Sequence, residues 1–196
     1  MIIDCHTHVF PRFFRDDRSG AAARDPAFKT LYASPEAKLA GTRALIHRMD
    51  LEGVQRAIIF GFPWEDPDDY RRHNDYIIAS VRQYPERLTG FCCFSPLSPF
   101  GAAEAERCLK TGLSGVGELA VYGSDLSSDV IKSLGDVMAV CRQMDVPLLL
   151  HVNEPVGHSY PGKTPNTLRQ IYAFLKTYPK NRIVLAHWGA VFSFMP

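Results

Sequence analysis

The sequence predicts an α/β fold of the (β/α)8-barrel type, of which the 196 residues contain about the first six β/α units. Short apolar runs alternate at regular spacing with segments of helical periodicity, which is typical of a parallel sheet built from βαβ units. Polar residues that can bind a metal or transfer a proton stand at the ends of several of these runs. In a parallel barrel the carboxyl ends of the strands meet at one mouth, where catalytic residues lie.

Each predicted strand is a short run rich in Ile, Val, Leu or Phe, of the kind that is buried on both faces of a parallel sheet. The six runs are residues 2–8, 54–60, 88–94, 116–119, 146–152 and 183–186. Between them, 3.6-residue spacing and capping residues such as Ser34, Asp66 and Thr164 predict five helices. These helices span residues 35–53, 67–84, 99–110, 130–144 and 165–178. Without any repeat or linker, residues 1–196 are expected to form a single domain.

The segment of residues 9–33 shows little periodicity, although it is rich in aromatic side chains. A connection of this length inside a compact domain is usually functional or disordered. The aromatic residues are Phe10, Phe13, Phe14, Phe28 and Tyr32. They suggest a lid or the wall of a pocket, and the alternative is a surface excursion that packs on itself.

The bulk composition limits the classes of function. The chain is 46% hydrophobic and 22% charged, and its net charge is only +1, which gives no electrostatic case for binding nucleic acid or an anionic membrane. No apolar stretch approaches the roughly 20 residues that span a bilayer, and no signal peptide is recognisable. The five cysteines lack metal or redox spacing and are expected to be reduced. We therefore expect a cytoplasmic protein.

The first strand carries two histidines that can act together. Residues i and i+2 of a strand point to the same face, so His6 and His8 share one face of this strand, with Asp4 below them. Two imidazoles at this spacing can share one divalent metal ion such as zinc. The alternative is that two polar residues simply lead the chain out of a strand into a loop.

Three further residues stand at the ends of later strands, namely Glu118, His151 and His187. Each of them alone could simply hydrogen-bond to backbone. Together with the His-x-His pair, they form a set of metal-binding or acid–base groups at one mouth. The remaining helical histidines, His47 and His73, are expected on the surface.

Four stretches carry a resemblance to a known family. They read IDCHTH at residues 3–8, NDY at 74–76 followed by YPERL at 84–88, LH at 150–151, and LAHWG at 185–189. With them the chain resembles the amidohydrolase superfamily of metal-dependent barrel enzymes, in the amidohydrolase-related branch that includes aminocarboxymuconate-semialdehyde decarboxylase. The resemblance extends from residue 2 to nearly the last residue. It is specific for the superfamily and not for a substrate.

The resemblance implies a metal site. His6 and His8 bind a divalent metal, His151 is a further ligand, and His187 lies beside the reacting water or the substrate. Glu118 resembles the strand-four glutamate of TatD-like hydrolases, which is a metal ligand, so it is expected either to bind the metal or only to hydrogen-bond. These ligands suit Zn²⁺ best, with Mn²⁺ and Fe²⁺ as alternatives.

One departure from the superfamily concerns the end of the barrel. The superfamily has an aspartate at the end of its eighth strand, as ligand and proton shuttle, whereas the sequence stops just after the sixth predicted strand. Because a full barrel takes about 250 residues, we expect these residues to belong to a longer barrel. The alternative is a self-sufficient, half-open sheet of six strands.

The implied function is metal-dependent hydrolysis of a C–N, C–O or lactone bond in a small metabolite by a metal-activated water. His187 would stabilise the developing oxyanion or move a proton, and Glu118 would take the proton of the water. The first alternative is non-oxidative decarboxylation of an unsaturated or aromatic carboxylate. The second is a non-catalytic remnant that binds a metal or a partner and forms a homo-oligomer.

Three residues outside the metal-binding set are candidates for contacts with an anionic small-molecule substrate. Trp64 follows the second strand and could stack on a ring, while His158 and Lys163 lie in the loop after the fifth strand and could hold an anionic group. Each of them could also be an ordinary loop residue.

Overall fold

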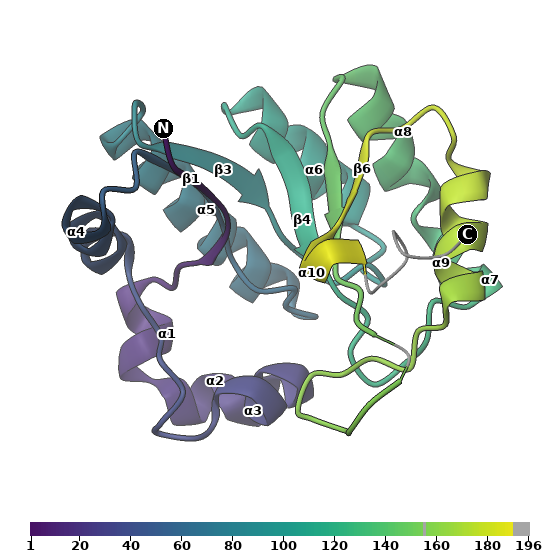
Figure 1. Ribbon diagram of the computed structural model, residues 1–196, viewed down its shortest axis with the longest axis horizontal. Coiled ribbons are helices and arrows are strands. Elements are labelled where there is room, and N and C mark those ends of the chain that lie inside the picture. The colour runs from purple at the N-terminus through teal and green to yellow at the C-terminus, as the bar shows by residue number, and fades with distance from the viewer. Residues whose placement is uncertain (155, 190–196) are drawn as a thin grey trace.

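Six parallel strands form one curved sheet in the computed structural model, which describes residues 1–154 and 156–189. The strands follow one another in sequence order across the sheet, as expected for consecutive units of a (β/α)8 barrel. They are β1 (Ile3–His8), β2 (Arg56–Phe60), β3 (Leu88–Cys92), β4 (Gly115–Leu119), β5 (Leu148–Leu150) and β6 (Ile183–Leu185). The predicted fold class and all six predicted strands are confirmed, and Figure 1 shows the sheet curled into part of a barrel.

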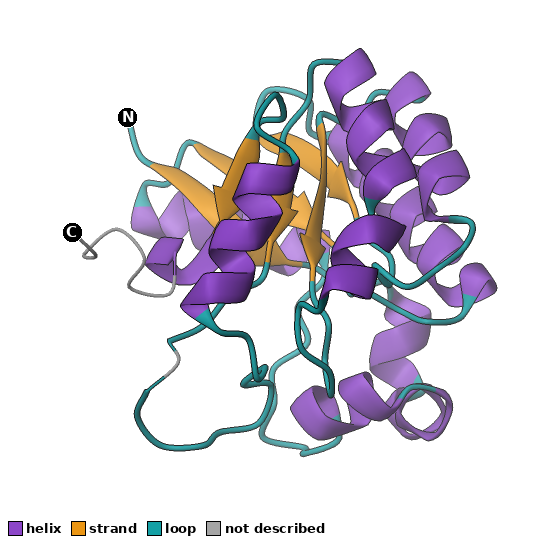
Figure 2. Ribbon diagram, turned by 90° about the vertical axis from the view of Figure 1, so that its right-hand side faces the viewer, coloured by secondary structure: helices purple, strands orange, loops and turns teal. Residues whose placement is uncertain are grey.

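Helices connect the strands and pack beside the sheet (Figure 2). They are α1 (Arg12–Asp16), α2 (Arg18–Arg24), α3 (Pro26–Tyr32), α4 (Thr42–Glu52), α5 (Pro67–Gln83), α6 (Gly101–Lys110), α7 (Ser128–Ser133), α8 (Gly135–Gln143), α9 (Leu168–Thr177) and α10 (Ala186–Gly189). Helix α5 packs on β2 and β3, and α6 packs on α8. Within the described residues, no helix is both long and apolar enough to cross a membrane.

Local capping explains where two helices begin. Helix α5 begins as predicted, because the Asp66 side chain accepts hydrogen bonds from the backbone N–H groups of Asp68 and Asp69. The predicted start at residue 35 is wrong, since Ser34 caps only a turn by accepting from the Glu36 N–H, and α4 starts at Thr42.

The predicted cap of the last long helix is also wrong. Thr164 uses its N–H and its hydroxyl to bind the side-chain oxygen of Asn153, at 2.8 and 2.6 Å. Helix α9 instead begins at Leu168, where Thr167 and Gln170 form a capping box. The helix-start signal at Thr164 therefore serves the loop rather than the helix.

The segment of residues 9–33 folds into three short helices set apart from the sheet (Figure 1). Its side chains Phe14 and Phe28 are fully buried and stack on the Trp64 ring, with centroids 4.3 and 4.7 Å apart. The segment thus packs against the loop that follows β2, and Tyr32, at its end, remains only partly buried. The segment therefore adds to the hydrophobic core at the carboxyl end of β2.

The expected surface position of His73 is wrong. His73 is completely buried on the inner face of α5, where it contacts the Phe10 and Phe14 rings, and burial lowers its pKa to about 3. His47 is exposed, as expected. Helical spacing alone could not separate the two positions, because their burial depends on what the rest of the chain places beside each helix.

The aromatic core beside Trp64 generates a stability prediction. Phe28→Ala removes a fully buried ring and should lower the free energy of unfolding by about 3–5 kcal/mol, because a cavity remains. Phe100→Ala is the matched control, since Phe100 is 60% exposed, and it should change stability by less than about 0.5 kcal/mol. Urea denaturation measures both, and equal effects would contradict the packing of Phe28 on Trp64.

Candidate metal centre

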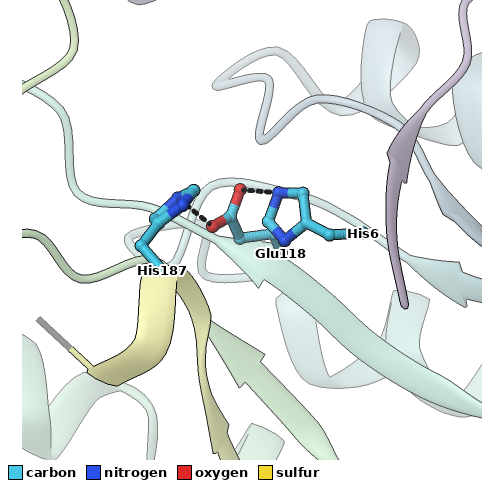
Figure 3. A group of neighbouring side chains, drawn as sticks. All are labelled: His6, Glu118 and His187. Atoms are coloured by element: carbon cyan, nitrogen blue, oxygen red, sulfur yellow. Dashed lines mark ion pairs between the residues drawn. The ribbon is translucent and has the colours of Figure 1, made fainter. Parts of the chain in front are cut away.

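The carboxylate of Glu118, at the end of β4, faces four imidazoles. His6 and His8 each place Nε2 3.4 Å from Oε2 of Glu118. On the other oxygen, Oε1, Nδ1 of His151 lies at 3.1 Å and Nε2 of His187 at 3.3 Å. Figure 3 shows Glu118 between His6 and His187. The structure therefore brings together all five residues that the sequence places at strand ends. These five residues are a candidate metal site, which is called the metal centre below.

Strand geometry explains why these side chains meet. Alternation along β1 directs His6 and His8 to the same face, where both rings pack edge-on against Phe60 of β2, with centroids 5.0 and 4.7 Å away. Across the sheet, Leu119 of β4 pairs with Leu150 of β5, so Glu118 and His151 lie at neighbouring strand ends. The metal centre thus lies on β1 and β4 and on the residues that follow β5 and β6 of one parallel sheet.

The protonation of the His8 ring follows from its backbone contact. Nδ1 of His8 lies 2.7 Å from the carbonyl oxygen of Gly61, which can only accept a hydrogen bond. Nδ1 therefore carries a proton, and Nε2 is the ring nitrogen that faces Glu118. A metal-binding histidine is usually oriented by such a hydrogen bond from its other ring nitrogen.

Two opposing effects act on the charge of Glu118. Its burial would raise its pKa, but hydrogen bonds from His151, His187, His6 and His8 together outweigh this effect and hold the pKa well below its usual range. The carboxylate is therefore an anion. The same contact raises the pKa of His187, because the imidazolium gains an anionic partner.

His187 differs from the other imidazoles of the metal centre in backbone and exposure. It adopts a left-handed conformation with φ of 53°, which is uncommon for a non-glycine residue, and its side chain is 47% exposed. Its Nε2 also lies 3.1 Å from Nδ1 of His151. His187 thus connects the buried part of the metal centre with the solvent.

The donor set fits a divalent cation. Two donors bound to one tetrahedral zinc at about 2.1 Å lie about 3.4 Å apart, and the closest donor separations around Glu118 are 3.1–3.4 Å. One donor atom from each of His6, Glu118 and His187 lies within 4.8 Å of the other two. The other ring nitrogen of His151, Nε2, is buried without a hydrogen-bond partner, so this ring is not committed elsewhere. Imidazole nitrogen and carboxylate oxygen suit zinc, manganese and iron.

A cavity of about 350 Å³ lies between α3 and the loop after β5. Its lining includes Tyr122, whose ring centroid is 5.6 Å from that of His151, so Tyr122 lies between the cavity and the metal centre. Burial raises the pKa of Tyr122 well above its usual range. It also raises the pKa of Tyr32, to about 12, and the negative charge of Glu118 adds to both shifts. Both phenols therefore stay protonated. Tyr122 was not identified from the sequence alone. Its position three residues after the end of β4, close to the carboxyl edge of the sheet, is the feature that could have identified it.

The three residues expected to contact the substrate lie in different environments. Trp64 is completely buried and donates to Nδ1 of His73, so no face of its ring is free to stack on a ligand. Lys163 lines the cavity, but its ammonium group binds the Glu154 carboxylate at 3.4 Å and two backbone carbonyls of its own loop. His158 is exposed in that loop. The expected role of Trp64 therefore does not agree with its placement.

Comparison with known families gives one match over almost the whole chain. The sequence profile of the family described as Amidohydrolase matches residues 3–193. Among curated proteins, none matches the chain.

Solved structures of similar fold include two decarboxylases and a hydratase. A 5-carboxyvanillate decarboxylase from Novosphingobium aromaticivorans, complexed with manganese and 4-hydroxy-3-methoxy-5-nitrobenzoic acid, is 19% identical with a TM-score of 0.70, over 99% of this chain and 67% of that one. A dihydroxybenzoic acid decarboxylase from a Polaromonas species, with manganese and the inhibitor 2-nitroresorcinol, is 19% identical with a TM-score of 0.61, over 98% and 67%. A 4-oxalomesaconate hydratase from Rhodopseudomonas palustris is 17% identical with a TM-score of 0.62, over 99% and 65%. The chain thus spans about two thirds of the length of these structures.

The geometry around Glu118 predicts a direct effect on metal affinity. Glu118→Gln should weaken Mn²⁺ and Zn²⁺ binding by at least tenfold, because even the loss of an outer partner of a metal ligand costs about 10–100-fold. Glu106→Gln, on the exposed face of α6, is the control and should leave the affinity unchanged. Calorimetric titration with each ion measures the change, and equal affinities in the two variants would exclude Glu118 as a ligand.

Proposed function

The chain belongs to the amidohydrolase family, and from this premise we propose that it is a divalent-metal-dependent decarboxylase of a small aromatic or unsaturated carboxylate. The observation that carries the proposal is the metal centre itself, whose His151 contacts Tyr122, a residue that also lines a cavity together with Tyr160. The presence of manganese and aromatic ligands in two structures of similar fold supports this choice over hydrolysis. Manganese is accordingly the first ion to test, and zinc is the second.

Four residues would hold the ion, namely His6, His8, Glu118 and His151. When bound, a divalent ion supplies positive charge that attracts the carboxylate of the substrate and stabilises negative charge in the transition state. His8 is oriented for this role, because its Nδ1 hydrogen bond to Gly61 turns Nε2 towards Glu118. Glu118 is suited to be a ligand rather than a proton acceptor, since its lowered pKa makes the carboxylate a weak base.

His187 would move the proton. Its ring is the half-exposed one in the metal centre, and its Nε2 lies within 3.3 Å of Glu118 and 3.1 Å of His151. In the proposed reaction a proton adds to the carbon that bears the carboxylate. The C–C bond then breaks, its electron pair returns to the unsaturated system, and carbon dioxide leaves. A positioned proton donor of this kind contributes about 10²–10⁴-fold to a rate.

Hydrolysis of a C–N, C–O or lactone bond is the second candidate. It is favoured by the description of the matching family and by the hydratase of similar fold, an enzyme that adds water to its substrate. The same residues would serve, with His187 stabilising an oxyanion instead of delivering a proton to carbon. The two reactions differ in their products, because only decarboxylation releases carbon dioxide.

The proposal predicts metal-dependent release of carbon dioxide. Purified protein loaded with Mn²⁺, and separately with Zn²⁺, should release carbon dioxide from at least one member of a panel of hydroxylated benzoates that includes 5-carboxyvanillate and dihydroxybenzoate. His187→Asn should lower the rate by about 100-fold or more, while His47→Asn, at an exposed position of α4, should not. Turnover of amides, esters or lactones without carbon dioxide would support hydrolysis instead. Metal binding without turnover of either panel would support a non-catalytic protein.

A further inference from the structure

We propose that His73 is a positioning residue of the metal centre: its buried imidazole holds the backbone of Val9, which follows His8, and of Gly61, which binds the His8 ring, so that His8 presents Nε2 to a metal ion. His73 lies on α5, where it has no contact with Glu118 and no place in the proposed chemistry. The inference rests on the proposed function only because it says that His8 binds a metal. The orientation and the ring proton of His8, which His73 is proposed to fix, can be measured in the metal-free protein.

Both ring nitrogens of His73 have a defined role. Nε2 lies 2.7 Å from the Val9 carbonyl oxygen, which can only accept, and Nδ1 lies 2.9 Å from Nε1 of Trp64, which can only donate. The ring is therefore neutral, with its proton on Nε2. Because His73 and Trp64 are both fully buried, water cannot replace either partner.

The first contact fixes the chain directly after His8. Val9 donates its N–H to the carbonyl of Phe60, at 3.1 Å, and its own carbonyl accepts from His73. Both backbone polar groups of Val9 are thus bound, one by β2 and one by α5. The direction in which the chain leaves β1, and with it the position of the His8 Cα atom, depends on this pair of hydrogen bonds.

The second contact lies behind the His8 ring. A Cβ atom added at Gly61 would lie 2.8–2.9 Å from three atoms of the His73 ring, so this ring packs directly on the Gly61 backbone. The carbonyl of the same Gly61 accepts the Nδ1 proton of His8 at 2.7 Å. One imidazole therefore supports both the residue that follows His8 and the group that selects the tautomer of His8.

An apolar residue of similar size would fill the space of the His73 ring but could form neither of its two hydrogen bonds. It would leave the Val9 carbonyl and the Trp64 indole N–H buried without hydrogen-bond partners, which lowers the stability of the fold. A positioning role and a purely packing role therefore make different predictions. Packing alone would change stability, whereas positioning would change the tautomer of His8 and the affinity for metal in the folded protein.

The test compares His73→Leu, which removes both hydrogen bonds, with His73→Gln, which keeps a donor near the position of Nε2. Nitrogen-15 spectra of the metal-free protein report which ring nitrogen of His8 carries the proton, and calorimetric titration with Mn²⁺ reports affinity. We expect His73→Leu to lose the fixed proton on Nδ1 of His8 and to bind Mn²⁺ at least tenfold more weakly, as for other outer partners of a metal ligand. His73→Gln should recover most of both properties, and His47→Leu should match the wild type.

A His73→Leu protein that is less stable but keeps the wild-type tautomer and affinity would overturn the inference. If that variant does not fold, Gly61→Ala supplies the same test, because its methyl group displaces the His73 ring, and an unchanged His8 tautomer there would also overturn it. A wild-type protein that binds no Mn²⁺ would contradict the proposed function. The tautomer measurement in the metal-free protein would still decide the role of His73.

Discussion

The carboxylate of Glu118 is 97% buried, with one oxygen towards His6 and His8 and the other towards His151 and His187. Burial of an anion is costly unless opposite charge or hydrogen-bond donors compensate for it. His8 holds its Nδ1 proton on the Gly61 carbonyl, so Nε2 is the ring nitrogen that faces Glu118. Nε2 lies 3.4 Å from a carboxylate oxygen, a separation at which the two atoms could both bind one divalent cation.

A chain of buried hydrogen bonds from α5 and α6 holds the backbone of Glu118 in place. The Cys93 thiol donates to the Glu118 carbonyl at 2.9 Å, and the Cys93 N–H donates to the Asn74 side chain, also at 2.9 Å. Asn74 in turn donates to the buried Glu104, at 2.8 Å. Burial would raise the pKa of Glu104, but hydrogen bonds from Arg107, Asn74 and Cys108 outweigh it and lower the pKa. A continuous buried polar chain thus connects α5 and α6 with the end of β4.

Much of the metal centre could be predicted from the sequence because it depends on local periodicity. Alternation along one strand places His6 and His8 on a common face, and parallel strands bring Glu118, His151 and His187 to one edge. These features follow from the strand pattern alone, so the strand positions needed to be correct only to within a residue or two.

What could not be predicted depends on contacts between distant segments. The burial of His73 requires residues 9–33 and the loop after β2 to close around α5, and helical spacing carries no information about either. Trp64 follows a strand end, as a substrate-binding residue would, yet the rings of Phe14 and Phe28 cover it. Ser34 carries a genuine capping signal that the fold uses for a turn. In each case tertiary packing outweighs a local signal.

The central claim is that the carboxylate of Glu118 and the imidazoles around it form a binding site for one divalent cation. Anomalous diffraction from crystals of the full chain grown with Mn²⁺, with data collected at the manganese absorption edge, tests this claim most directly. The claim predicts an anomalous peak within about 2.0–2.3 Å of Oε2 of Glu118 and of the facing Nε2 atoms of His6 and His8. A well-ordered Glu118 and His8 without such a peak between them, or a peak elsewhere on the protein, would contradict it.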